Sequence, residues 1–200
     1  MKTILAKTSI MTILVLAAAV PAAAESNSSG PPALAKQLLP AKGGGRLFVT
    51  SEALSSGQAL DERFTQNGEN RSPPVTWTKG PTGTVSYAIL VEDSSVDRPE
   101  PVTHWVVYDI PSTVTRVAEN QPRQAEIASG AEQGLNVRKE LGFIGPKPPA
   151  GETHNYHFQV FALNTRLKLD PAETDRDDMI KAMKGRVLAS GDLVVNYTGK

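Results

Sequence analysis

Three segments of this chain combine the two-residue period of a β-strand with a polar residue at one end of an apolar face. They are residues 85–93, 102–110 and 155–163. Successive side chains of a strand point to opposite faces. In the first segment Asp93 therefore ends a face formed by Val85, Tyr87, Ile89 and Val91. The pattern predicts three strands with a small polar site at the rim of their sheet.

The same alternation of side chains assigns the faces of the other two segments. His104 shares its face with Val106, Tyr108 and Ile110, and His154 has the parity of Tyr156, Phe158, Val160 and Ala162. His157 falls on the opposite face from His154, so we exclude it from the site. Trp105 and Tyr108 are expected in the core, because aromatic side chains dominate core packing.

Shorter runs and turn signals mark the rest of the chain. The other expected elements are strands at 47–49, 75–77 and 187–197, a helical turn at 34–39, and a helix between the N-cap Thr174 and Gly185. Residues 192–195 look buried on both faces, and 114–142 predict a long loop with one short ordered piece. Strands separated by turn signals predict a mainly β sandwich with a few short helices.

The N-terminus has the pattern of a secretory signal. Lys2 and Lys7 precede an apolar stretch at 10–20 and a small-residue site at 22–24. The stretch is shorter than the roughly 20 residues of a membrane-spanning helix. We therefore expect residues 1–24 to be a signal peptide, with no transmembrane segment after cleavage and a periplasmic or secreted protein.

Composition indicates the domain organisation and excludes several kinds of binding site and chemistry. Residues 25–45 are rich in Ser, Pro, Gly and Ala and predict a flexible lead-in, and 46–200 predict one domain. The formal net charge is +0, which argues against a nucleic-acid partner. The chain has no cysteine, and this excludes disulfides, a thiol nucleophile and a Cys-based metal site.

Asp93, His104, His154 and Tyr156 together make a candidate polar site. Imidazole and phenol groups donate hydrogen bonds to an anion, and a protonated imidazole adds positive charge. The Gly145-Pro146 step allows a close backbone approach, because glycine has no side chain. The set suits a phosphate with a small cationic head group, while the carboxylate orients a histidine or receives the amine.

Each of these residues also fits a simpler structural role or a different chemistry. Asp93 can begin a turn, and His104 can be a satisfied core histidine. Two histidines and a carboxylate can bind a metal, but the chain lacks H-E-x-x-H and H-x-H spacing, so we expect none. A hydrolase using Ser94 or Ser95 would lack a G-x-S-x-G elbow and an oxyanion-hole motif. We therefore expect neither such a hydrolase nor a cofactor.

Residues 145–156 read Gly-Pro-Lys-Pro-Pro-Ala-Gly-Glu-Thr-His-Asn-Tyr. With Glu92-Asp93 leading to His104-Trp105, and Ser72-Pro73-Pro74 leading to Trp77, this stretch resembles the phosphatidylethanolamine-binding protein family, most closely its bacterial Raf-kinase-inhibitor-like branch. The resemblance covers nearly the whole domain. It implies an antiparallel β-sandwich in which a large sheet packs on a smaller one.

One signature departs from the family. The family usually has D-P-D-A-P where residues 93–97 read Asp-Ser-Ser-Val-Asp, so Ser95 replaces the second carboxylate. An amine partner is thereby lost, which places phosphoethanolamine recognition in question. A plain anion, such as phosphate or a carboxylate, remains a suitable ligand.

The resemblance implies a binding protein rather than an enzyme. We expect an exported binder of a small anion or a phospholipid head group; the alternative is a protein-interaction module that inhibits a protease, a kinase or an envelope or host partner. The bacterial relatives also allow a homodimer. The expected ligand-binding residues are Asp93, Ser95, His104, Gly145, Pro146, His154 and Tyr156.

Overall fold

The computed structural model describes residues 30–200, so the expected signal peptide lies outside the described residues. None of the helices in this part of the chain has the length and hydrophobicity needed to span a bilayer. The elements are α1 (Ala35–Leu38), η1 (Lys42–Gly44), β1 (Gly45–Arg46), β2 (Val49–Thr50), η2 (Glu62–Phe64), β3 (Val75–Trp77), β4 (Ser86–Asp93), β5 (Val102–Pro111), β6 (Arg116–Val117), β7 (Glu132–Gln133), β8 (Thr153–Leu163), α2 (Arg176–Met183) and β9 (Val187–Thr198).

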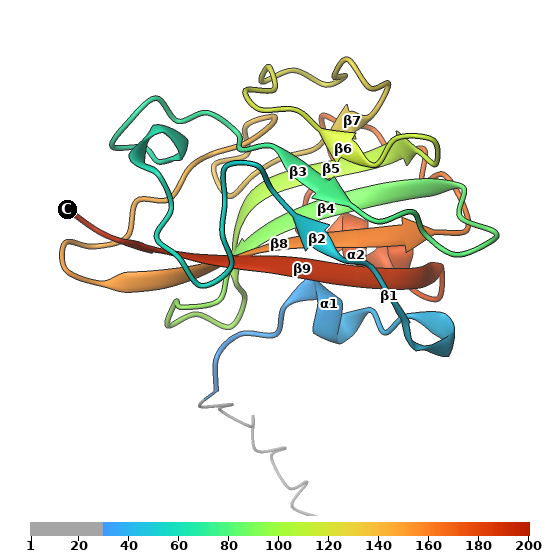
Figure 1. Cartoon of the computed structure of the whole chain (residues 1–200), viewed down its shortest axis with the longest axis horizontal. Coiled ribbons are helices and arrows are strands. Elements are labelled where there is room, and N and C mark those ends of the chain that lie inside the picture. The colour runs from blue at the N-terminus through green and yellow to red at the C-terminus, as the bar shows by residue number, and fades with distance from the viewer. Residues whose placement is uncertain (1–29) are drawn as a thin grey trace, which may run out of the picture. The chain divides into compact units, whose positions relative to one another are not determined.

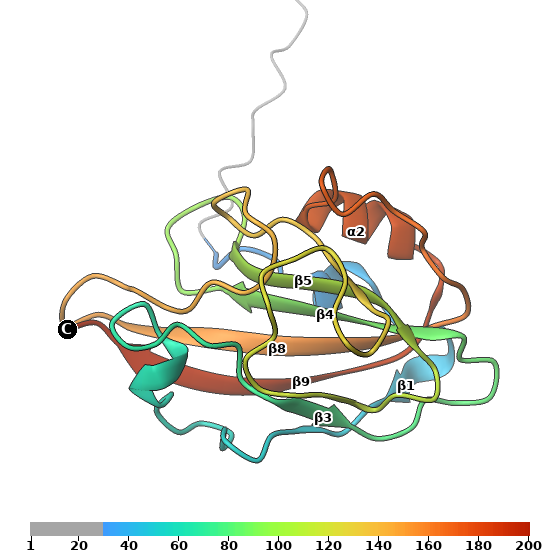
Figure 2. The same cartoon turned by 90° about the horizontal axis from the view of Figure 1, so that it is seen from above.

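The strands form two sheets (Figure 1). The larger has the order β1-β9-β8-β4-β5-β7 and the smaller β2-β3-β6. Figure 2 separates the layers: β3 lies on one side of the large sheet and α2 on the other. The predicted sandwich of a large sheet on a smaller one, with few short helices, is confirmed.

The large sheet is mixed rather than purely antiparallel. β1 pairs in parallel with β9, whereas the other pairings between these strands are antiparallel. At this edge a Cβ on Gly45 would lie 2.4 Å from the carbonyl oxygen of Leu188. Glycine is the residue that lets the two backbones approach this closely.

All residues of β4 are buried, because both faces of this central strand are covered. Tyr87, Ile89 and Val91 belong to the core between the sheets. Ala88 and Leu90 belong to a second core beneath α1 and α2. The predicted alternation of faces in this strand is confirmed.

The described part of the expected flexible lead-in is packed on the domain. Residues 31–200 form one compact unit, in which Ala35 and Leu39 are buried in the second core. The backbone N–H of Ala35 donates to Glu92, and that of Lys36 donates to Gln159. Composition alone suggested flexibility, but a few apolar residues and buried acceptors on the sheet hold this segment.

Two local predictions differ from the structure. Residues 192–195 alternate between buried and half-buried rather than being buried throughout, because one face of β9 is only partly covered. The N-cap of α2 is Asp175 instead of Thr174, since the Asp175 carboxylate accepts hydrogen bonds from the N–H groups of Asp177 and Asp178. Gly185 has a φ of 74°, as expected for the residue after the C-cap.

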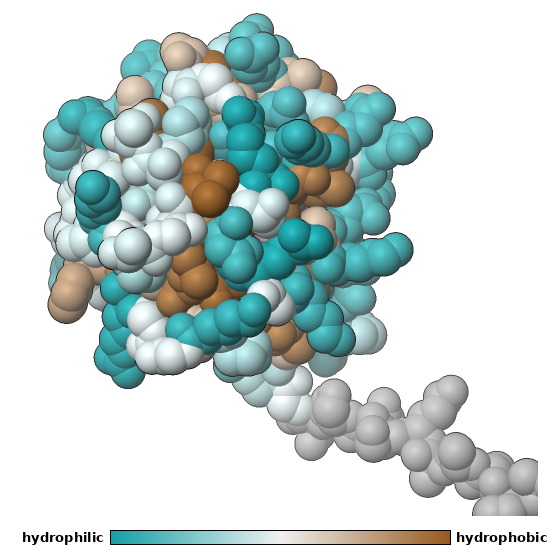
Figure 3. Space-filling view, turned by 90° about the vertical axis from the view of Figure 1, so that its right-hand side faces the viewer, coloured by the Kyte–Doolittle hydropathy of each residue, from teal (hydrophilic) through white to brown (hydrophobic). Residues whose placement is uncertain are grey.

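Large exposed hydrophobic side chains are few within residues 30–200. Figure 3 views the end of the sandwich where β4 begins, and its hydrophobic side chains emerge in small groups between hydrophilic ones. The exposed large hydrophobic residues are Leu38, Phe48, Val85 and Val137. Single exposed apolar residues are ordinary on a protein surface and define no interface by themselves.

Candidate functional site

A cavity of about 510 Å³ lies where β4 ends and β5 and β8 begin. The polar ends of the three predicted strands therefore meet at one rim of the sheet. Five predicted residues line the cavity, namely Asp93, Ser95, His104, His154 and Tyr156. The predicted Gly145 and Pro146 do not line it, although their neighbours Ile144 and Lys147 do.

Gly145 supports the loop beneath the cavity. Its N–H donates to Oδ1 of Asn70 over 2.7 Å. A Cβ at this position would lie 2.4 Å from the carbonyl oxygen of Phe64. The close backbone approach expected of this glycine is thus made to the 64–70 segment of the protein.

Pairing between β4 and β8 places two site residues side by side. Asp93 is directly opposite Tyr156 in the antiparallel ladder, and both side chains point toward the sandwich side of the sheet. His154 precedes Tyr156 by two residues and so has the same orientation. These three positions follow from strand period and register.

His104 reaches the cavity through a β-bulge. Val91 pairs with Trp105 but Glu92 pairs with Thr103, so His104 is an extra residue of β5. A bulge interrupts the alternation of faces. The predicted common face of His104, Val106, Tyr108 and Ile110 is therefore wrong: Val106 and Tyr108 lie in the core beneath the helices. A second register shift, between the pairs Tyr87–Ile110 and Ile89–Val107, returns Ile110 to the core between the sheets.

Asp93 and His154 form a buried polar pair in the cavity. Oδ2 of Asp93 lies 2.7 Å from Nδ1 of His154, and its Oδ1 accepts the N–H of Ser95 over 2.8 Å. Burial opposes protonation of His154, but the hydrogen bond and charge of Asp93, with a contribution from Glu152, raise its pKa overall. His154 thus tends toward the cationic form that favours an anionic ligand.

His104 has the opposite tendency. Burial lowers its pKa, and this outweighs the backbone hydrogen bond of Ile144 and the charge of Asp93. Its Nδ1 lies 2.7 Å from the carbonyl oxygen of Ile144, and its ring meets that of Tyr156 edge-on at 5.3 Å. The cavity therefore contains two different imidazoles: that of His104 favours the neutral form, and that of His154 favours the protonated form.

Tyr156 supplies a phenol that stays protonated. Burial, followed by the nearby charge of Asp93 and by Tyr197, raises its pKa well above the ordinary value. A protonated phenol can donate a hydrogen bond to an oxyanion.

Three cations of the cavity wall, Arg98, Arg138 and Lys147, were not predicted. They come from loops, where no strand period reveals the direction of a side chain. Only Lys147 had a local signal, because it lies inside the distinctive 145–156 stretch. Formally, these three cations balance the three carboxylates that also line the cavity, Asp93, Asp97 and Glu152.

His157 lies on the other face of β8, as expected, and does not line this cavity. Its Nε2 is 3.2 Å from Oγ of Ser94, and its Nδ1 is 3.5 Å from Asp192 without making a hydrogen bond. Ser94, His157 and Asp192 are therefore not a connected catalytic relay. No group of three or more His, Cys, Asp and Glu residues with metal-site geometry occurs within residues 30–200.

A two-sheet sandwich with a polar cavity at the strand ends defines a class of ligand-binding β proteins. The sequence model of the phosphatidylethanolamine-binding protein family matches residues 50–198, and the chain belongs to this family. A UPF0098 protein of Methanothermobacter thermautotrophicus is 37% identical over 150 residues, which cover 74% of this chain and 97% of that protein. The UPF0098 protein YbcL of Escherichia coli is 37% identical over 125 residues, which cover 58% and 68%.

Solved structures agree with this assignment. The crystal structure of Escherichia coli YbcL has a TM-score of 0.73 and 29% identity, and covers 78% of this chain and 100% of that one. A phosphatidylethanolamine-binding protein homologue from Chlamydia trachomatis, CT736, has a TM-score of 0.68 and 29% identity, with coverage of 78% and 99%. Family membership and fold both support a binding protein.

Proposed function

We propose that this protein is an exported, non-enzymatic binder of a small anion, with the cavity beside Asp93 as its binding site. The observation that carries the proposal is the group of donors around one cavity. His154 tends toward its charged form, Tyr156 keeps its proton, and Arg98, Arg138 and Lys147 add positive charge. Export rests on the signal pattern of residues 1–24.

A binding role is favoured over catalysis by what the polar groups contact. Asp93 bonds to His154 and to the Ser95 backbone, and His104 bonds to the Ile144 carbonyl. Within the cavity no contact joins a serine hydroxyl to a histidine base, which nucleophilic catalysis would require. The contact of Ser94 with His157 lies on the opposite face of β8, and Nδ1 of His157 makes no hydrogen bond to a carboxylate that could orient it. The contacts hold hydrogen-bonding groups in place around the cavity.

Ser95 bears on whether the ligand carries an amine. Its Oγ accepts the N–H of Asn155 over 2.9 Å, so the hydroxyl fixes the turn after β4 against β8. A serine here offers no negative charge to an ammonium group. A plain oxyanion is therefore the simplest ligand, and phosphoethanolamine is the direct test of amine recognition.

The test is calorimetric titration of the purified protein with phosphate and phosphoethanolamine, alongside His154→Ala. We expect saturable binding that the substitution weakens by about tenfold or more, as loss of a charge-assisted hydrogen bond implies. His157→Ala is the matched control, because His157 lies on the opposite face and should leave affinity unchanged. Absence of binding by the unmodified protein would contradict the proposal and favour a protein-interaction module.

A further inference from the structure

Two buried polar groups that line the cavity, His104 and Asp93, offer hydrogen-bond acceptors. Nδ1 of His104 lies 2.7 Å from the carbonyl oxygen of Ile144. A carbonyl oxygen cannot donate, so Nδ1 must carry the ring proton. In the neutral ring Nε2 is then a bare acceptor. This Nε2 is buried and makes no hydrogen bond to any group within residues 30–200.

The surroundings keep His104 neutral. Burial is the main influence on its pKa and lowers it, and the nearby His154 acts in the same direction. The Ile144 carbonyl and Asp93 oppose this shift without overcoming it. Nε2 therefore meets a ligand as an acceptor.

Asp93 adds a second acceptor beside the first. Its side chain is only 5% exposed, and its two oxygens receive the Ser95 N–H and the His154 ring. Each carboxylate oxygen still has a free lone pair. An oxyanion without a proton would place its own lone pairs against Asp93 and Nε2 of His104, which costs free energy when the groups are buried.

We propose that the cavity selects an oxyanion that keeps a proton, so that it binds hydrogen phosphate and rejects acceptor-only oxyanions such as sulfate. This inference rests on the proposed anion-binding function and specifies the ligand class of the same site. The P–OH group of the ligand donates to His104 or Asp93, and the other phosphate oxygens accept hydrogen bonds from donor groups that line the cavity. The titratable and charged groups that face the cavity are Asp93, Asp97, Arg98, His104, Arg138, Lys147, Glu152, His154 and Tyr156.

The proposal distinguishes two sources of a phosphate ligand, namely free inorganic phosphate and the head group of a phospholipid. Inorganic phosphate carries a proton at neutral pH, whereas the phosphodiester of an intact phospholipid head group carries none. A phosphodiester should therefore behave like sulfate at this site. The ligand expected here is a free phosphate rather than the head group of a membrane lipid.

The deciding experiment is titration of the purified protein at neutral pH with inorganic phosphate, sulfate and dimethyl phosphate. We expect sulfate and dimethyl phosphate to bind at least about tenfold more weakly than phosphate, because a site built around a ligand hydrogen rejects analogues that lack it. Equal affinities for the three anions would overturn the inference, while still supporting an anion-binding site without this selectivity. No binding of any anion would contradict the proposed function itself.

Two variants test the assignment to His104. In His104→Gln the side-chain amide can turn its NH₂ toward the ligand, so the preference for phosphate over sulfate should fall toward equality. Lys147→Gln is the matched control: Lys147 acts by charge, so both anions should weaken by the same factor with their ratio unchanged. A ratio that stays constant in His104→Gln would refute the role of Nε2. If that variant does not fold, the comparison of anions on the unmodified protein still decides the question.

Discussion

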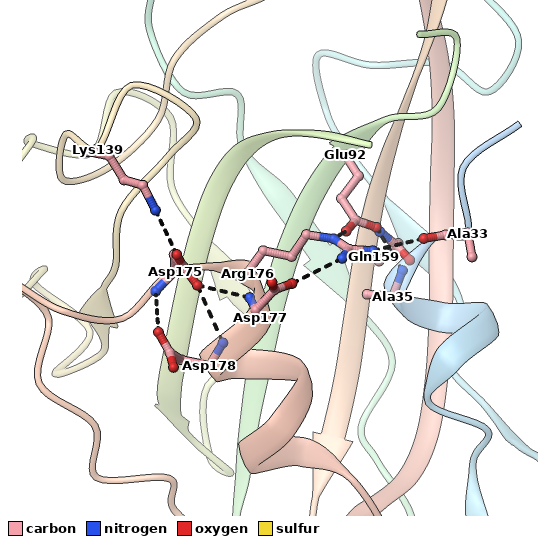
Figure 4. Close-up of polar contacts among 9 residues, drawn as sticks. All are labelled: Ala33, Ala35, Glu92, Lys139, Gln159, Asp175, Arg176, Asp177 and Asp178. Carbon is pink, nitrogen blue, oxygen red and sulfur yellow. Dashed lines mark hydrogen bonds and ion pairs between the residues drawn. The ribbon is translucent and has the colours of Figure 1, made fainter. Parts of the chain in front are cut away.

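Glu92 and Asp93 are consecutive residues of β4, and their carboxylates lie on opposite faces of the large sheet. Asp93 lines the cavity, whereas Glu92 is fully buried beneath α1 and α2. Figure 4 shows the contacts of Glu92, which accepts from Nε of Arg176 at 2.5 Å, Nε2 of Gln159 at 2.6 Å and the N–H of Ala35 at 2.8 Å. The end of β4 that carries the site is therefore held from both sides.

The ion pair of Glu92 with Arg176 leads to a first prediction. Arg176→Met leaves Glu92 buried without its cation, and this should lower the free energy of unfolding by about 3–5 kcal/mol. Urea denaturation measures the loss. The double variant Glu92→Gln with Arg176→Met removes both charges, so its free energy of unfolding should fall by less than that of Arg176→Met alone. A loss below about 1 kcal/mol in Arg176→Met would contradict a structural role for the pair.

The backbone contact of Ala35 with Glu92 can be tested by removing one N–H group. Ala35 is the first residue of α1, a position where proline fits, and Leu34 before it is already extended with ψ of 153°. Ala35→Pro should therefore remove the donor with little backbone strain and cost about 1–3 kcal/mol. Thermal unfolding gives the change. Ala33→Pro is the control variant. Ala33 contributes only its carbonyl oxygen, which accepts from Arg176 and is kept in proline, so this variant should lose less stability than Ala35→Pro.

The pair of Asp93 with His154 makes stability depend on pH. The pKa of His154 is raised above its ordinary value of 6.5 in the folded protein. Protonated His154 therefore adds stability below about pH 6.5, and this contribution disappears as pH rises through the folded pKa. Asp93→Asn removes the main group that raises this pKa.

Imidazole proton resonances followed by NMR between about pH 5 and 9 would report this shift. We expect the pKa of His154 to fall in Asp93→Asn, and the stability difference between the two proteins to be larger at low pH. His157→Ala identifies the resonance of His157 and His104→Gln that of His104, so the third histidine, His154, is assigned as well. His157→Ala should leave the His154 titration in place. An unchanged His154 titration in Asp93→Asn would show that the pair does not form in solution.

Gly145 provides a test of the loop beneath the cavity. A Cβ would lie 2.4 Å from the Phe64 carbonyl oxygen, so Gly145→Ala must push the 64–70 segment away from the loop. Overpacking of this kind costs about 1–3 kcal/mol, measurable by urea unfolding. Gly30→Ala is the control, because nothing lies within 4 Å of a Cβ there. Equal stability of the two variants would contradict the close packing of Gly145.

Strand period and signature residues determined much of the architecture in advance. The period of β4 and β8 gave the correct faces, because these strands pair in regular register over the length of β4. Asp93, His154 and Tyr156 were placed correctly for the same reason. Their meeting at one rim also required β4 to lie between β5 and β8 and antiparallel to both, since Asp93 ends its strand whereas His104 and His154 are near the starts of theirs.

Tertiary structure alone decided the features that depend on contacts between distant segments. His104 lines the cavity because β5 gains one residue against β4, and no period in the sequence marks a bulge. The 31–45 segment is ordered because Glu92 and Gln159 lie where its N–H groups need acceptors. Arg98, Arg138 and Lys147 reach the cavity from loops whose paths are set by packing. The sequence by itself determined which strands carry polar ends, since side-chain alternation is a local property, whereas the register of β5 and the loops depended on long-range packing.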